Sequence, residues 1–170
     1  VTFDYNEGSY NTETKEVQYG SVLDPNTFPQ NDTGSKRIIG WSIYRNELVE
    51  FTGTVGNNIT LYAMWQEYKE FNLVTDANQE PSKLTIDKNQ ELELPTPKKD
   101  GYIFEGWFTT SHFSGFPVEK VTYGSAFDTY YAKWSPEQYS ISFETNGGDA
   151  LINNVSYTIL DNINLPSPGK

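Results

Sequence analysis

The stretch Gly101-Tyr102-Ile103-Phe104-Glu105-Gly106-Trp107 predicts a β-strand, and its final Gly-Trp pair occurs earlier in the chain as Gly40-Trp41. A second pattern follows each pair, and it ends in Ala63-Met64-Trp65 in the first instance and in Ala132-Lys133-Trp134 in the second. Self-similarity at one period, here about 70 residues, is the signature of a repeat architecture. We therefore predict two repeats, residues 1–68 and 69–138, and the truncated start of a third repeat, residues 139–170.

Strand signals dominate each repeat, so we predict a mainly β protein with about four strands in each module and little helix. Apolar and polar residues alternate in Val1–Tyr5, as in a strand with one buried face. A second strand is expected near Val17–Val22 and near Leu84–Leu94. The third strand ends in the Gly-Trp pair, and the fourth contains the Ala-x-Trp pattern. The segments between these two strands, Arg45–Asn58 and Thr109–Phe127, differ most and leave room for a short helical turn.

The composition excludes several classes of function. The 170 residues hold 23 acidic and 12 basic side chains, and the formal net charge of −11 opposes binding to nucleic acid or to anionic lipid. The sequence has no cysteine, so we expect neither disulfides nor thiolate metal sites, and no cofactor. No apolar run approaches the roughly 18 residues that a membrane-spanning helix needs, so we expect no membrane insertion.

His112 is the single histidine of the chain. A catalytic histidine needs a nucleophile or an orienting carboxylate nearby, and the first repeat has no counterpart of His112. The acidic residues are scattered and fit no calcium-loop pattern. We therefore interpret His112 as an exposed loop residue and expect that the chain is not an enzyme.

The repeated residues resemble a known family. A Pro-x-Pro connector, a Gly-Tyr-x-Phe-x-Gly-Trp strand and a closing Ala-x-Trp strand are similar to the Listeria–Bacteroides repeat, the B-repeat of internalin-type surface proteins. The first repeat departs from this pattern at Ser35-Lys36-Arg37-Ile38, and the third carries only its opening strand, Asn146-Gly147-Gly148 and the pair Pro166 and Pro168. The second repeat carries the pattern through Pro95, Pro97, Gly101, Tyr102, Phe104, Gly106, Trp107, Ala132 and Trp134.

The resemblance implies compact β-grasp-like modules in tandem on a secreted or wall-attached bacterial protein, of the Gram-positive type. Such modules act as a spacer stalk or as adhesion units, so the implied partners are a host or cell-wall protein, a glycan, and neighbouring repeats of the same chain. Two alternatives stay open. One is a carbohydrate-binding module, and the other is an accessory domain of a secreted enzyme.

Aromatic side chains divide into expected core residues and candidates for partner contact. The four tryptophans, Trp41, Trp65, Trp107 and Trp134, recur at matching positions, so we predict that all four pack in the cores. The contact candidates lie on the opposite face of the closing strands or in a loop of the second repeat, and they are Tyr62, Tyr131, Phe113 and Phe116.

The two ends of the chain carry separate expectations. Because Val1–Tyr5 reads as the middle of a strand, we expect the chain to be part of a longer protein. The apolar residues of segment 139–170 lack closing strands of their own. This segment is expected to be poorly ordered, to pack on the second repeat or on another chain, or to complete the sheet of the second repeat.

Overall fold

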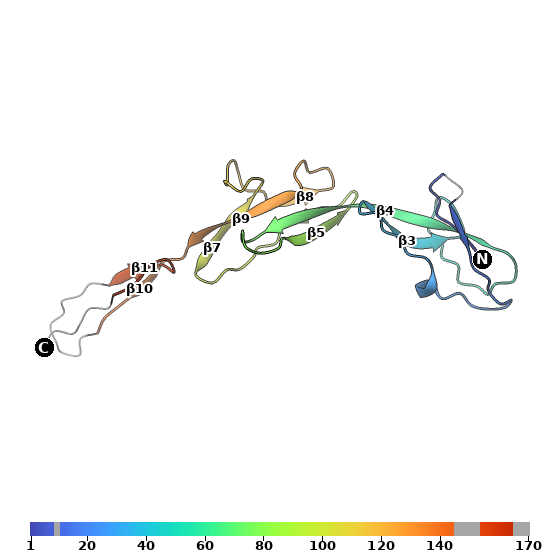
Figure 1. The fold of residues 1–170 in the computed structure, drawn as a ribbon, viewed down its shortest axis with the longest axis horizontal. Helices are drawn as coiled ribbons and strands as arrows, with labels where there is room; N and C mark the ends of the chain where they lie inside the picture. Colours follow the sequence, from blue (N-terminus) through green and yellow to red (C-terminus); the bar gives the residue numbers. More distant parts are fainter. Residues whose placement is uncertain (9–10, 145–153, 165–170) are drawn as a thin grey trace. The chain divides into compact units, whose positions relative to one another are not determined.

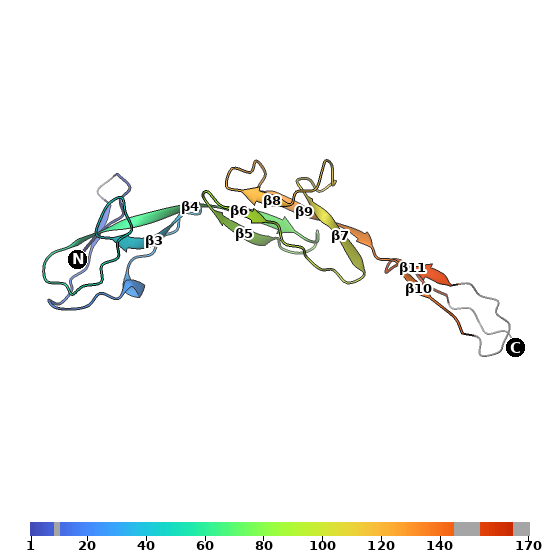
Figure 2. The same cartoon turned by 180° about the vertical axis from the view of Figure 1, so that it is seen from behind.

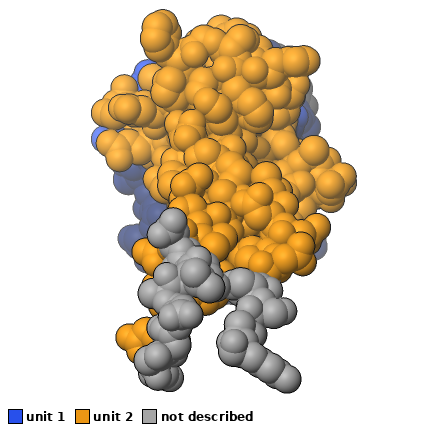
Figure 3. All heavy atoms as spheres, turned by 90° about the vertical axis from the view of Figure 1, so that its left-hand side faces the viewer, with its two compact units in different colours: residues 1–70, 85–90 blue, residues 71–84, 91–170 orange. Residues whose placement is uncertain are grey.

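The computed structural model describes residues 1–8, 11–144 and 154–164, and its main class is β, as predicted. In these residues the one helical element is a 3-10 turn, η1 (Pro25–Thr27). The chain forms two compact units (Figure 3). Unit 1 comprises Val1–Glu70 with Thr85–Gln90, and unit 2 comprises Phe71–Leu84 with Glu91–Lys170.

Unit 1 is built around the first part of strand β4 (Thr60–Val74) (Figure 1). Strand β1 (Thr2–Asp4) pairs with it in parallel, with Phe3 opposite Leu61, and β3 (Lys36–Ser42) pairs on the other side in antiparallel. Strand β2 (Thr12–Thr14) forms an antiparallel hairpin with β1. The alternation of each strand buries one face, and the resulting core consists of Phe3, Ile38, Trp41, Leu61 and Ala63.

Unit 2 repeats this arrangement with later strands (Figure 2). The last residues of β4 pair in parallel with β9 (Thr129–Pro136), with Leu73 opposite Tyr130. Strand β7 (Tyr102–Phe108) pairs with β9 in antiparallel. The register of β7 shifts between Phe104 and Gly106, as the register of β3 shifts between Ile38 and Gly40. The Gly-Trp strand and the closing strand therefore form where the sequence predicts them, with one irregularity in common.

Three shorter strands complete the description as far as Pro136, and the residues of the first are divided between the two units. Strand β5 (Ser82–Asp87) pairs with β4, and β6 (Glu91–Glu93) pairs with β8 (Lys120–Thr122) in antiparallel. Val121 at the centre of β8 is fully buried. The predicted limit between the first two repeats, after residue 68, lies inside β4, which runs on into the second repeat as one strand.

The expectation of a second strand at Val17–Val22 is wrong. The strand that follows β1 is β2, and next to it the backbone N–H of Tyr5 donates to the carbonyl of Asn11 at 3.0 Å. Residues 18–21 form a turn instead, with Gly20 at a φ of +80°. The single strand expected at Leu84–Leu94 is likewise interrupted by a turn, and Asn89 in that turn has a φ of +72°.

The tryptophans make the same hydrogen bonds in both repeats. The indole N–H of Trp41 donates to the carbonyl of Pro29 at 2.9 Å, and that of Trp107 donates to the carbonyl of Pro95 at 2.7 Å. Both rings are buried, which confirms the predicted core role for these two. Trp65 and Trp134 are half-buried rather than exposed: Trp65 packs against the core of unit 1, and the ring of Trp134 lies edge-on to Phe104 with ring centres 5.4 Å apart. Each donates its indole N–H to the end of the opening strand, to Tyr5 at 2.7 Å and to Thr75 at 2.9 Å.

In the described part of segment 139–170, strand β10 (Tyr139–Ile141) pairs in antiparallel with β11 (Val155–Tyr157). The predicted turn at Asn146-Gly147-Gly148 and the proline pair at 166 and 168 lie outside the described residues. Beyond β11, the side chain of Ile159 packs on Gly101. The packing is so close that a Cβ atom on residue 101 would lie only 2.8 Å from Cδ1 of Ile159. Residues of the third repeat thus pack against the second, inside unit 2.

Candidate binding site

Unit 2 contains a groove of about 420 Å³ beside the closing strand, which we call the Tyr131 groove. Ligand sites are typically hollows of about 300–1,000 Å³ with apolar walls and a few polar groups. The walls come from the end of β4, the turn that follows it, the loop after β7, and β9. The lining residues are Val74, Thr75, Asp76, Ala77, Lys99, Ser111, Phe113, Tyr131, Ala132 and Trp134.

Tyr131 lines the groove together with Ala132 and Trp134 of the same strand. Its neighbours Tyr130 and Ala132 are 2% and 5% exposed and lie in the core, whereas Tyr131 is half-buried. Trp134 supplies a second aromatic wall, and its hydrogen bond to the carbonyl of Thr75 fixes the indole in place. The sequence predicts Tyr131 as a residue of partner contact and Trp134 as a core residue.

Phe113 enters the groove from the loop between β7 and β8. Its backbone has a φ of +55°, and its N–H donates to the carbonyl of Thr110 at 3.1 Å. The ring packs edge-on against Phe108, with ring centres 5.8 Å apart. Phe116, from the same loop, is 92% exposed and lies outside the groove lining. His112 is exposed, and its Nδ1 lies 3.4 Å from the hydroxyl of Ser111.

One end of the groove carries an ion pair. The ammonium of Lys99 lies 2.9 Å from the carboxylate of Asp76. The hydrogen bond from Lys99, followed by one from the backbone N–H of Asn78 and by the positive charge of Lys99, lowers the pKa of Asp76 below its ordinary value. The same ammonium lies 4.7 Å from the ring centre of Tyr102 and 6.0 Å from that of Trp134, within cation–π range.

The matching position of the first repeat, Tyr62, has a different environment. The guanidinium of Arg45 lies over the Tyr62 ring at 4.4 Å and also forms a 2.9 Å ion pair with Asp4. Tyr62 pairs with Ser42 of β3 as Tyr131 pairs with Phe108 of β7. The two tyrosines therefore share a place in the fold, but an arginine covers one ring and the other lines a groove.

Aromatic walls beside an ion pair can stack against a flat apolar face and hydrogen-bond its polar edge, which suits a sugar ring or an aromatic peptide side chain. Within residues 1–8, 11–144 and 154–164, no three His, Cys, Asp or Glu side chains gather in a way that could hold a metal ion. The same residues include no helix of the length and apolarity required to cross a membrane.

Asp76 and Lys99 are the site residues that sequence reasoning missed. They lie 23 residues apart, on a turn and on a connector, and no local pattern links them. The one available signal was the Asp76-Ala77-Asn78 turn, in which the side chain of Asp76 accepts the backbone N–H of Asn78 at 3.1 Å.

The two all-β units repeat one arrangement of strands, which defines a tandem repeat protein, and comparison with known families gives the repeat its identity. Residues 71–133 match the Listeria-Bacteroides repeat domain, so the second repeat belongs to that family. This match confirms the resemblance predicted from the sequence. Such repeats are typical of bacterial surface and membrane proteins.

Three relatives are similar over most of this chain. A protein of Evansella cellulosilytica whose name describes a Gly-rich membrane protein is 31% identical over 159 residues, which cover 89% of this chain and 18% of that protein. A second membrane protein by name, from the same organism, is 30% identical over 164 residues, covering 87% of this chain and 23% of its own length. Internalin H of Listeria monocytogenes is 24% identical over 148 residues, which are 75% of this chain and 25% of that protein.

The chain thus spans about a quarter or less of the length of these relatives. No solved structure matches it.

Proposed function

We propose that this chain is a non-enzymatic repeat region of a bacterial cell-surface protein, and that it works outside the cell as a spacer. The observation that carries this proposal is the recurrence of one structural unit with the same parallel and antiparallel pairings and the same indole hydrogen bonds. Such repetition sets a length by the number of copies. The surface and membrane proteins among the relatives support the location.

The join between the repeats also supports a spacer role. Strand β4 closes the first repeat and opens the second, and its fifteen residues include neither glycine nor proline. A flexible linker would instead be rich in glycine and serine. The β-grasp-like form of each module stays a prediction. The described segment between β3 and β4 is a loop and contains no helix.

Surface display tests the spacer role. An epitope tag would be placed ahead of Val1, and the chain would be anchored to a bacterial wall with one, two or three copies between tag and anchor. A spacer predicts that antibody access to the tag rises with copy number and that an unrelated stiff spacer of equal length substitutes for it. Antibody access to the tag that does not change with copy number would contradict the proposal.

Adhesion is a second candidate function, and the Tyr131 groove is the observation that favours it. Its aromatic walls and the Asp76–Lys99 pair fit a glycan or an aromatic peptide segment. A glycan array and purified wall fragments would serve as probes. The adhesion role predicts binding that falls at least about tenfold in Tyr131→Ala.

A matched variant distinguishes the loss of a tyrosine in the groove from the loss of an equivalent tyrosine elsewhere. Tyr62→Ala removes the equivalent tyrosine of the first repeat, whose ring Arg45 already covers, and is expected to leave binding unchanged. Equal losses in both variants, or no binding to any probe, would count against the groove as the adhesion site.

A further inference from the structure

Each repeat has a turn of the same kind after its opening strands, and we call these turns the repeat tips. They comprise residues 18–21, 87–90 and 158–161. In each, the N–H of the fourth residue donates to the carbonyl of the first at 3.1 Å. The tips are 69 and 71 residues apart, which matches the repeat period. They therefore occupy one structural position in three copies.

The tip of the second repeat is bound by residues of the first repeat, all within unit 1. The carboxylate of Asp87 lies 2.6 Å from the guanidinium of Arg37. The ammonium of Lys88 lies 2.8 Å from the carboxylate of Glu67, and the backbone N–H of Lys88 donates to the Glu67 carbonyl at 2.8 Å. Lys88, the second residue of its turn, thus makes both a side-chain and a backbone contact.

The tip of the third repeat is bound at the matching place in the second repeat. Ile159 is also the second residue of its turn, and it packs on Gly101. Gly101 corresponds to Ser35, because the carbonyl of each accepts a 2.9 Å hydrogen bond from the chain leaving the closing strand, from Glu137 and from Tyr68. Both tips therefore lie where a Gly-Trp strand begins and a closing strand ends.

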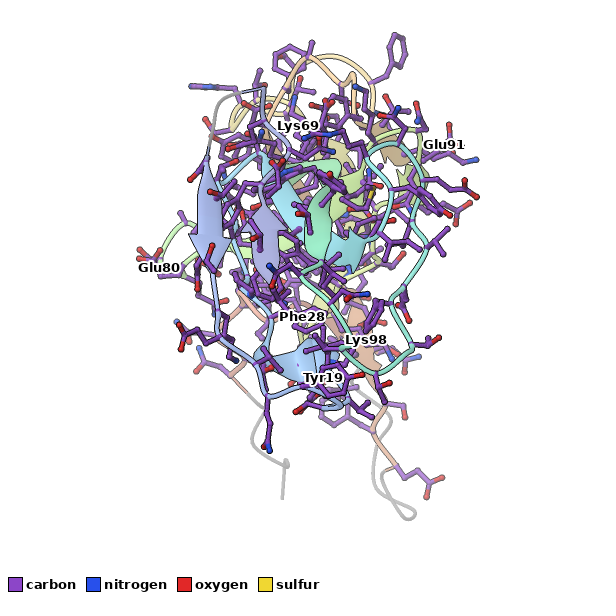
Figure 4. All side chains as sticks on the ribbon, turned by 90° about the vertical axis from the view of Figure 1, so that its right-hand side faces the viewer. Tyr19, Phe28, Lys69, Glu80, Glu91 and Lys98 are labelled. Carbon is purple, nitrogen blue, oxygen red and sulfur yellow. The ribbon has the colours of Figure 1, made fainter. Side chains whose placement is uncertain are left out.

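The tip of the first repeat carries Tyr19 as its second residue, and Tyr19 is 82% exposed (Figure 4). Val22, just beyond this tip, is 73% exposed. The tip is nevertheless held in shape by its own repeat. The N–H of Gly20 donates to the carbonyl of Val55 at 2.8 Å, and the N–H of Val55 donates to the carbonyl of Ser21 at 2.9 Å. It therefore presents a formed apolar surface.

We propose that the Tyr19 tip is the docking surface for the end of another repeat of the same kind, one with glycine at the position of Gly101. In each described contact the tip residue and its neighbour are complementary. The ammonium of Lys88 pairs with the carboxylate of Glu67, and the side chain of Ile159 packs on Gly101, which has no side chain. A tyrosine carries no charge to pair with the carboxylate of Glu67, whereas a glycine at the position of Gly101 leaves room for its ring. The tip residue thus selects the repeat on which the tip docks.

This inference rests on the repeat architecture and is independent of the spacer role, so either can fail alone. The test joins residues 1–140 directly to a second copy of residues 1–170, which places the second Tyr19 after a complete repeat containing Gly101. Tyrosine labelling by a diazonium reagent is then read by mass spectrometry. We expect the average labelling rate of Tyr19 to fall about twofold relative to the single chain, since one of its two copies is covered. Tyr44, which is 56% exposed, serves as the internal reference.

Gly101→Asn in the first copy supplies the specific control, because asparagine tolerates the positive φ of +76° at this position. The added side chain is expected to restore the labelling of the second Tyr19. Unchanged Tyr19 labelling in the joined chain would overturn the proposal. Protection that survives Gly101→Asn would also overturn it.

Discussion

The equivalent positions 40 and 106 favour glycine for different physical reasons. Gly106 has a φ of +126°, and a Cβ there would lie 2.7 Å from Cβ of Pro117. Gly40 lacks the positive φ, and its Cβ would meet the end of the Leu48 side chain at 2.9 Å. A close neighbour is therefore present at both glycines, and in each repeat it is a side chain of the segment that differs most between the repeats.

The first prediction compares the two glycines. Gly106→Ala combines backbone strain with a clash against a stiff ring and should cost about 2–4 kcal/mol of unfolding free energy. Gly40→Ala meets a leucine tip that can rotate and should cost less than about 1.5 kcal/mol. Urea unfolding of both variants gives the two values, and similar costs would contradict the difference in strain.

A second prediction concerns the Asp76–Lys99 pair of the Tyr131 groove. A folded-state pKa below the ordinary value means that the ionised carboxylate stabilises the fold at pH above about 3.8, and that this contribution is lost as the pH falls through the lowered pKa. Lys99→Met should raise the pKa of Asp76 towards its ordinary value, because the first cause of the shift is removed. Carboxyl-carbon NMR titration measures it.

Asp161 provides the control for that titration. Its pKa is also lowered, by hydrogen bonds from the backbone and hydroxyl of Thr158, and Lys99 is not among the causes. Lys99→Met should leave Asp161 unchanged. An unchanged pKa of Asp76 in Lys99→Met would show that the hydrogen bond from Lys99 does not lower this pKa.

At the residue scale, sequence reasoning reached the aromatic part of the groove more readily than its polar part. Tyr131 follows from strand alternation, and Phe113 from a loop present in one repeat alone. Asp76 and Lys99 depend on a tertiary contact that no periodicity encodes. The stacking of the Arg45 guanidinium on the Tyr62 ring is also a tertiary contact. The sequence therefore could not distinguish the environment of Tyr62 from that of Tyr131.

At the element scale, the strands that the sequence predicts well are those with one strongly buried face. Strands β3 and β7 end in a buried Trp and a buried neighbour, and β9 alternates Tyr130 and Ala132 inward. Strand β2 escapes prediction because all three of its residues are exposed, so no apolar alternation marks it. Strand β8 has one buried residue, Val121, which is too short a signal.

A third prediction ranks the strands by local stability. The described pair β10 and β11 has three residues in each strand, and a two-stranded hairpin is marginally stable in water. Strands β7 and β9 share the buried core of unit 2. Amides of β10 and β11 should therefore exchange with solvent at least about 100-fold faster than those at the centre of β7 and β9. Equal protection, measured by hydrogen-exchange mass spectrometry, would show that β10 and β11 belong to a larger cooperative unit.

At the scale of the whole molecule, the charge and the aromatic content are properties of a repeated surface and a repeated core. The net charge of −11 is spread over the three repeats, since residues 1–68, 69–138 and 139–170 each carry more acidic than basic side chains. Repulsion between like surfaces opposes collapse of one repeat onto another and edge-to-edge pairing. A chain of this kind suits a role in which length matters.

Small-angle X-ray scattering of the single chain and of residues 1–140 joined to residues 1–170 tests the spacer role most directly. The joined chain has about 1.8 times as many residues, so a spacer whose length adds with each copy should show a maximum dimension about 1.8 times larger. A chain that folds into one compact body would grow by only about 1.3-fold, because compact size rises with roughly the 0.38 power of length. The spacer role predicts the first result, and the second would contradict it.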